Sequence, residues 1–227
     1  MDILNNLLQR LERSSPGSAE SSRRVVSMIK GGGKALYFGD ECMTPSLLAQ
    51  AGCEVTALIT EESRIPHGGD VTYITAKGFE PAQLGQYDVI WYNGFAEFDL
   101  PQVRLEQLKG ACKKGGTVVY RTLCWLIDPS PDTRSYCKKR FGVITPLDSV
   151  LVTAKQAGFK IEDFYIAPKT DWTEGFYAPL SAAVQEYADS RESDSSLASG
   201  MGELERETSM FALHCEEYSC VYYILKG

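Results

Sequence analysis

The chain has 227 residues, 44% of them hydrophobic and 23% charged, which is an ordinary balance for a globular protein with a sizeable core. Its formal net charge of -7 and isoelectric point near 5.0 argue against a phosphate-backbone partner, so we expect no nucleic-acid binding. The sequence has no apolar run of the roughly 18 residues that a membrane span needs and no secretory signal, so we expect no membrane association and a cytoplasmic location.

Seven cysteines and two histidines limit the metal and disulfide chemistry that this chain can support. The cysteines are scattered and show no C-x-x-C spacing, so we interpret them as buried apolar residues of a protein in a reducing compartment. Two histidines are too few for a histidine-rich metal site, and we expect no metal.

Helical and strand patterns alternate through the first half of the chain. Apolar residues at helical spacing predict helices over 2–13, 19–30, 45–51 and 100–112. Short apolar or β-branched runs predict strands over 34–38, 53–59, 71–75, 87–92 and 117–122. This alternation predicts a parallel sheet wrapped by helices on both faces.

The second half continues the same alternation. We expect helices over 148–157, 179–191 and 201–217, and strands over 160–166 and 219–225. The polar residues 192–199 are interpreted as loosely ordered. Because no internal repeat or independent linker is visible, we expect one domain over 1–227, with N-terminal helices (1–30), a core (34–166) and C-terminal helices with the last strand (167–227).

Several motifs lie at the places where a doubly wound sheet binds its ligand, beyond the carboxyl ends of its strands. Residues 35–44 read ALYFGDECMT, residues 87–98 include YDVI followed by NGFAEF, and residues 172–180 read WTEGFYAPL. Together with Pro16-Gly17-Ser18 before the second helix, these runs resemble class I S-adenosylmethionine (SAM)-dependent methyltransferases of the small-molecule type. The resemblance covers essentially the whole chain.

The resemblance implies a Rossmann-like, mostly parallel seven-stranded sheet that closes with a C-terminal antiparallel hairpin. It also implies SAM as the cofactor and a small-molecule substrate. The cofactor-binding positions it assigns follow the first four strands, and they are Gly39, Asp40, Glu41, Glu61, Ala76, Asn93 and Gly94. The substrate-binding positions it assigns are Pro16, Gly17, Trp125, Trp172, Phe176 and Tyr177. For the last three, anchoring of the following helix is the alternative role, and for Trp125 the alternative is packing in the core.

Three departures from the family pattern bear on function. The first loop keeps Gly39, but Glu41 and Met43 stand where later glycines are expected, and Tyr37 takes the usual acidic position. After the second strand, Ile59 replaces the carboxylate that holds the ribose. After the third strand, Thr75-Ala76-Lys77 stands where an aspartate is common.

Two functions follow as hypotheses. The first is a SAM-dependent methyltransferase, in which the carboxylates of Asp40 and Glu41 lie near the positive sulfonium. The alternative is a catalytically inactive relative that binds another ligand or supports a partner subunit, and a homodimer or heterodimer is left open. No catalytic residue is assigned, because methyl transfer depends mainly on alignment. Arg121 is interpreted as holding an acidic substrate or pairing with a carboxylate. The missing G-x-G-x-x-G motif argues against a dinucleotide-dependent oxidoreductase.

Overall fold

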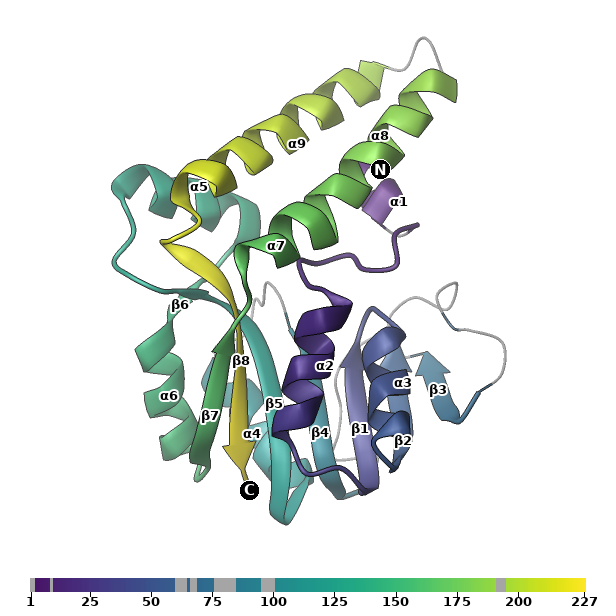
Figure 1. Cartoon of the computed structure of the whole chain (residues 1–227). Coiled ribbons are helices and arrows are strands. Elements are labelled where there is room, and N and C mark those ends of the chain that lie inside the picture. Colours follow the sequence, from purple (N-terminus) through teal and green to yellow (C-terminus); the bar gives the residue numbers. More distant parts are fainter. Residues whose placement is uncertain are drawn as a thin grey trace.

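A single sheet runs through the middle of the computed structural model (Figure 1), which describes residues 3–8, 10–59, 65, 69–75, 85–94, 101–190 and 195–227. Its strands are β1 (Gly33–Gly39), β2 (Cys53–Ile59), β3 (Val71–Thr75), β4 (Tyr87–Asn93), β5 (Cys112–Trp125), β6 (Thr145–Pro146), β7 (Lys160–Ile166) and β8 (Tyr218–Lys226). They are arranged in the order β3-β2-β1-β4-β5-β8-β7, and β6 pairs with β5. Strand β8 is antiparallel to both of its neighbours, and the other pairs are parallel.

Helices cover both faces of this sheet and its carboxyl-terminal edge (Figure 1). They are α1 (Ile3–Leu8), α2 (Ala19–Met28), α3 (Met43–Gln50), α4 (Pro101–Ala111), α5 (Pro131–Phe141), α6 (Leu147–Gln156), α7 (Lys169–Trp172), α8 (Ala178–Ser190) and α9 (Ser195–His214). A π-helical turn (Thr173–Tyr177) joins α7 to α8. None of the helices in the described ranges is long and apolar enough to cross a bilayer.

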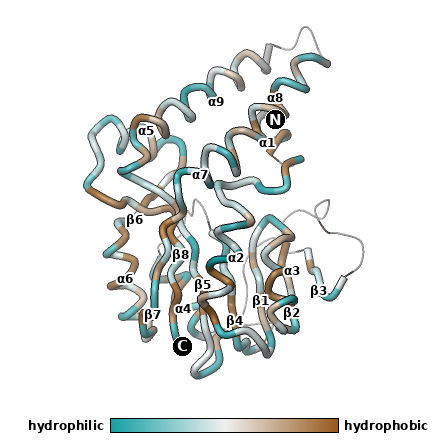
Figure 2. The backbone as a smooth tube through the Cα atoms, viewed as in Figure 1, coloured by the Kyte–Doolittle hydropathy of each residue, from teal (hydrophilic) through white to brown (hydrophobic). Residues whose placement is uncertain are grey.

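The strand pleat divides the core into two apolar layers. Residues that alternate along β1, β4 and β5 point in turn to the side of α2 and α3 and to the side of α4 and α6. Leu36, Ile90 and Val118 share one register row and pack with Leu105 of α4 and Val150 of α6. Figure 2 shows the resulting apolar character along the central strands, which is expected for strands buried on both faces.

The predicted fold class is confirmed. The path of the sheet contains seven strands, the antiparallel pair is β7 and β8, and the helices lie on both faces. The two antiparallel strands are not joined by a short turn, because α7, the π-helical turn, α8 and α9 lie between them in sequence. These inserted helices extend over the carboxyl ends of the parallel strands (Figure 1).

Four local predictions were wrong. The helix expected over 2–13 ends at Leu8, and the N–H groups of Arg10 and Leu11 close turns on the carbonyl oxygens of Leu7 and Leu8. Helix α5 was not predicted, although Ser130 caps it and Pro131 stands in its first turn. The aromatic residues before the helix expected over 179–191 lie in two further helical elements, Trp172 in α7 and Phe176 and Tyr177 in the π-helical turn. The polar stretch expected to be loosely ordered contributes Ser195 and the residues after it to α9, and residues 192–194 lie outside the described part.

Candidate functional site

The order of the strands places a switch point between β1 and β4, and we call the edge of the sheet beyond their carboxyl ends the crevice. The chain leaves β1 toward β2 on one side, while β4 lies on the other side of β1 and continues the sheet in the opposite direction. Loops that leave such neighbouring strands diverge, and ligands of open α/β sheets bind in the gap beyond the carboxyl ends. Here the gap is bordered by Gly39 to Cys42 after β1 and by Asn93 and Gly94 at the end of β4.

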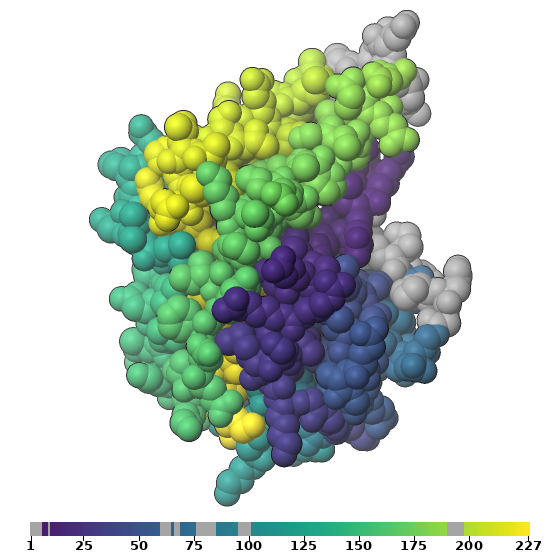
Figure 3. Space-filling view, in the orientation of Figure 1, coloured from purple at the N-terminus to yellow at the C-terminus, as the bar shows by residue number. Residues whose placement is uncertain are grey.

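A segment that we call the strap, residues 13–17, lies against this crevice. The backbone N–H of Ser14 donates to Asp40 Oδ2 over 3.1 Å, and the N–H of Gly17 donates to the carbonyl oxygen of Asp171 over 3.1 Å. In the space-filling view, the N-terminal part of the chain packs between the green atoms of α7 and α8 and the blue atoms of α3 (Figure 3). The strap therefore connects the crevice to the helices inserted after β7.

The side chain of Arg121 on β5 donates hydrogen bonds to the strap. Its side chain is buried, and its Nη2 donates to the carbonyl oxygen of Pro16. Its Nη1 lies 3.1 Å from both Asn93 Oδ1 and the Gly94 carbonyl oxygen. The hydrogen bonds described for this guanidinium, including one to Cys220 Sγ at 3.2 Å, all go to uncharged groups. Arg121 thus joins the strap, the end of β4 and the last strand.

Glu41 turns its carboxylate toward the start of α3. The side chain is only 1% exposed, and its Oε2 accepts the N–H of Met43 over 2.7 Å and the N–H of Thr44 over 3.1 Å. The hydroxyl of Thr44 donates to the other carboxylate oxygen. The first N–H groups of a helix attract anions. In this chain the protein's own glutamate occupies that position.

Arg13 of the strap completes the charge pair with Glu41. Its Nη2 lies 3.7 Å from Glu41 Oε2, and both side chains are largely buried. The same nitrogen donates to Ser22 Oγ over 3.3 Å and approaches Met43 Sδ at 3.8 Å. Because Thr44 Oγ1 also lies 3.1 Å from Ser22 Oγ, the four polar side chains form one buried network.

The loop after β1 is closely packed at Gly39. A Cβ added to Gly39 would collide with the hydroxyl of Tyr37 and would lie 2.8 Å from Asn93 Cβ. The Asn93 amide donates to Tyr37 Oη over 3.3 Å and to Asp40 Oδ1 over 3.4 Å. Burial, together with the carboxylates of Glu41 and Asp40, raises the pKa of Tyr37 well above its usual range. The phenol is therefore neutral at physiological pH.

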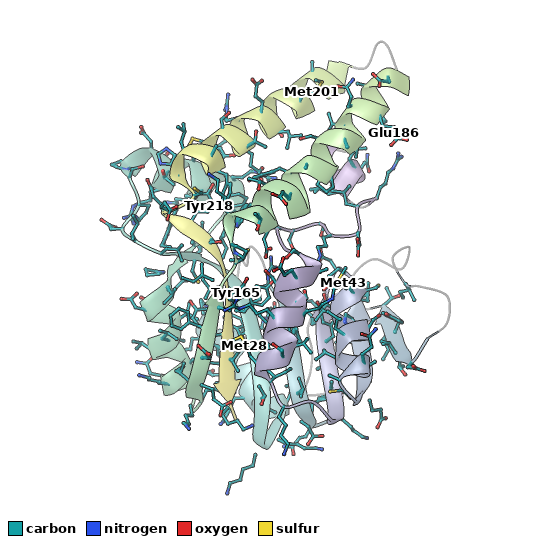
Figure 4. The ribbon with its side chains drawn as sticks, in the orientation of Figure 1. Met28, Met43, Tyr165, Glu186, Met201 and Tyr218 are labelled. Carbon is teal, nitrogen blue, oxygen red and sulfur yellow. The ribbon has the colours of Figure 1, made fainter. Side chains whose placement is uncertain are left out.

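Two pockets adjoin residues predicted to bind substrate, and they are separate. A pocket of about 300 Å³ lies between the strap, Met43 and the π-helical turn, and its lining includes Gly17 and Gly175. Figure 4 shows Met43 at the start of α3, below the N-terminal segment. A second pocket of about 370 Å³ is lined by Trp125 and residues of the loop that follows β5. Gly17 and Trp125 therefore line different pockets.

The three predicted aromatic residues Trp172, Phe176 and Tyr177 lie in the core, with exposures of 0%, 3% and 4%. The Trp172 ring stacks on Phe211 at 4.5 Å, and its Nε1 donates to Ser219 Oγ over 3.1 Å. This packing attaches α7 and α9 to β8, which corresponds to the anchoring alternative.

The remaining predicted positions divide into three groups. Gly39, Asp40, Glu41, Asn93 and Gly94 come together at the crevice. Glu61 and Ala76 lie outside the described residues. Pro16 and Gly17 lie directly above Arg121, since a Cβ on Gly17 would lie 3.9 Å from Arg121 Nη2.

Two site residues were missed by sequence reasoning. Arg13 fell within a predicted helix, and its partner Glu41 is far away in the sequence, so no local signal marked it. Asp171 is 1% exposed, and within the described ranges neither carboxylate oxygen has a hydrogen-bond partner. Among the described residues, no group of His, Cys, Asp or Glu side chains is arranged to hold a metal ion.

Comparison with known proteins identifies the fold. No family model and no curated protein matches the sequence. A SAM-dependent methyltransferase from Geobacter sulfurreducens, solved with S-adenosyl-L-homocysteine, matches with a TM-score of 0.76 and 14% identity, over 99% of this chain and 98% of that one. Its counterpart from Thiobacillus denitrificans, solved with the same compound, matches with a TM-score of 0.78 and 15% identity, over 99% of each chain.

A more distant match extends the comparison. The cyclopropane synthase MmaA2 from Mycobacterium tuberculosis has a TM-score of 0.68 and 12% identity, over 92% of this chain and 83% of that one. The first two matches span almost the whole chain. This chain has the fold of the class I SAM-dependent methyltransferases.

Proposed function

We propose that the chain is a SAM-dependent methyltransferase that acts on a small-molecule acceptor. The observation that carries this proposal is the crevice at the carboxyl ends of β1 and β4, in a sheet of the methyltransferase type. Two of the similar structures were solved with S-adenosyl-L-homocysteine (SAH). Because fold alone does not determine function, the proposal depends on whether the residues of the crevice fit such a ligand.

The loop around Gly39 bears on the cofactor in two ways. Gly39 has no side chain, but the Tyr37 hydroxyl and Asn93 Cβ occupy the place of its missing Cβ, so an adenosyl group must approach the backbone beside them. A sulfonium is positive, and the carboxylate of Asp40 lies at the same loop. We propose that Gly39, Asp40, Asn93 and Gly94 hold the cofactor. Glu61 and Ala76, after β2 and β3, remain proposed contacts.

The strap and the pocket beside it suit the acceptor. Bound SAM would supply an electrophilic methyl group, and the protein must align an acceptor with it and exclude water. The strap lies against the crevice and is fixed there by Arg121. Gly17 and Met43 line the adjoining pocket of about 300 Å³, which is large enough for a small molecule. We propose Pro16 and Gly17 as acceptor contacts, and a role of Trp125 would involve the second pocket.

The catalytically inactive alternative rests on Glu41. Its carboxylate occupies the N-terminus of α3, a position suited to the negative end of a ligand. A chain with this arrangement could bind a different ligand in the crevice or support a partner subunit.

The two functions differ in what SAM and SAH do to the melting temperature. If the chain binds these compounds in its native state, each raises the melting temperature with increasing concentration. The variant Asp40→Asn removes the carboxylate nearest the proposed sulfonium. We therefore expect it to weaken the binding of SAM more than the binding of SAH, whose thioether sulfur is uncharged. Asp70→Asn, at an exposed position before β3, is the matched control and should leave both affinities unchanged.

An unchanged melting temperature at about millimolar SAM and SAH would contradict the methyltransferase proposal and support the alternative. If Asp40→Asn weakened the binding of SAM and of SAH equally, the role assigned to Asp40 would be contradicted and the cofactor assignment would stand.

A further inference from the structure

We propose that Glu41 is an internal competitor for the carboxylate of the ligand in the crevice. By occupying the N-terminus of α3, it lowers the affinity for SAM and SAH relative to adenosyl compounds that carry no carboxylate. The inference rests on the proposed function, because it requires that an adenosyl ligand bind at the crevice. It adds a residue that determines which adenosyl compound binds best.

The first step is the position of the Glu41 carboxylate. Helix α3 begins at the edge of the crevice, and its first N–H groups form the anion-attracting end of the helix. Met43 and Thr44 direct these N–H groups at Glu41, and the hydroxyl of Thr44 adds a third donor. At 1% exposure, the carboxylate is a fixed part of the interior.

The second step concerns the buried cations near the crevice. Arg13 lies 3.7 Å from Glu41 and also contacts Ser22 and Met43. Arg121 already donates to Pro16, Asn93 and other uncharged acceptors. Both guanidinium groups at the described part of the crevice are therefore engaged by the protein itself. A ligand carboxylate would have to replace Glu41 at α3 and at Arg13.

The third step is the chemistry of the ligands. SAM and SAH each have a single carboxylate, at the amino-acid end. Methylthioadenosine has the same adenosyl thioether without the amino acid, so it does not compete with Glu41. SAH also carries an ammonium that methylthioadenosine lacks, so the affinity ratio between the two compounds reports on the whole amino-acid end. The change of this ratio when Glu41 is replaced isolates the effect of Glu41.

Calorimetric titration of the full chain measures this ratio. Glu41→Gly removes the competing carboxylate and leaves Arg13 and the α3 N–H groups for the ligand. We expect it to tighten SAH binding about tenfold, because a charge-assisted hydrogen bond of this kind contributes about one such factor. Methylthioadenosine should change by less than about twofold, since it makes no carboxylate contact.

Two further variants make the result independent of folding defects. Glu41→Gln keeps the length of the side chain and can still accept N–H groups of α3, but it carries no charge against Arg13. It should improve SAH binding in the same direction by a smaller factor. Glu20→Gln makes the same chemical change at an exposed position of α2 and should alter neither affinity. Circular dichroism establishes that each variant is folded, and Glu41→Gln carries the test if Glu41→Gly is not.

The outcomes separate this inference from the proposed function. If SAH and methylthioadenosine bind but their ratio is the same in the wild-type chain and in both Glu41 variants, Glu41 is not a competitor and only the inference fails. If neither compound binds any of the folded variants, the crevice is not an adenosyl site and the proposed function fails with it.

Discussion

The charges of Glu41 and Arg13 are removed from water together, and their energetics depend on the pairing. A buried carboxylate without partners is strongly unfavourable, and an ion pair offsets this cost only with good geometry and additional hydrogen bonds. Glu41 has those additional bonds from Met43 and Thr44. Removing Arg13 alone would leave a buried charge without its counterion, which typically costs about 3–5 kcal/mol.

The cysteines provide a test of burial at the scale of single residues. Burial raises the pKa of the Cys124 and Cys137 thiols to about 12, and raises that of Cys220 to about 11 even though Arg121 lowers it. The thiolate is the reactive form, so these three should resist iodoacetamide at about pH 8 in the native protein. Cys42 and Cys215 are partly exposed and should react first.

Mass spectrometry of peptides from native and unfolded protein measures this order. The reactivity of the three buried thiols should increase as pH rises toward their pKa values. Rapid native labelling of Cys124 at about neutral pH would show that β5 and β8 separate in solution, because Cys124 Sγ lies 3.1 Å from Tyr223 Oη between them.

Sequence reasoning located part of the candidate site. The strand ends at Gly39 and Asn93 could be placed together, because the carboxyl ends of neighbouring parallel strands meet at one edge of a sheet. The direction of the Glu41 side chain could not be predicted, since it depends on Arg13, and their contact joins distant parts of the chain. Arg121 was recognised as a candidate, but its uncharged partners were not foreseen.

At the scale of elements, the strap and the π-helical turn depend on close backbone contact. Gly175 of the turn lies against the carbonyl of Gly17, so that a Cβ at Gly175 would collide with the Gly17 carbonyl oxygen. The turn could not be predicted from the sequence, because its aromatic residues also fit a loop that covers a ligand. Packing against α9 and β8 decided in favour of a helix, as the stacking of Trp172 on Phe211 shows.

A pair of glycine substitutions tests this contact. Gly175→Ala should lower the free energy of unfolding by about 1–3 kcal/mol, because the new methyl group meets backbone atoms that cannot move freely. Gly202→Ala, in α9, is the control: a Cβ there meets nothing within 4 Å, so the same change should stabilise the helix by about 0.5–1 kcal/mol. Urea unfolding measures both values. Equal effects of the two substitutions would show that the strap does not pack on the turn.

At the scale of the whole molecule, the sheet is unevenly protected. Strand β8 is buried over almost its full length, and β5 is buried from Thr117 onward. Within the described residues, strand β3 lies at the edge, pairs only with β2 and has no fully buried residue. The parallel sheet and its helical layers followed from the alternating pattern of the sequence, whereas the order of the strands did not. The angle and reach of α8 and α9 did not, since they depend on tertiary packing against α1 and β8.

The rates of amide hydrogen exchange should follow this difference in burial among the strands. We expect amides of β5 and β8 to exchange only through global unfolding, and amides of β3 to exchange through local opening at a much lower free energy. Mass spectrometry of peptides over a time course measures the order. Protection of β3 equal to that of β5 would contradict the prediction and indicate that another surface covers this edge.

The position of β8 has a consequence for biosynthesis. This strand follows β7 in sequence but lies between β5 and β7 in the sheet, so neither neighbour can complete its backbone pairing until β8 has left the ribosome. A nascent chain that stops short of β8 presents two open strand edges, which are sites of self-association. Tyr222 and Cys220, which contact Arg121, also belong to β8. The crevice is therefore assembled in full only after translation has passed its last strand.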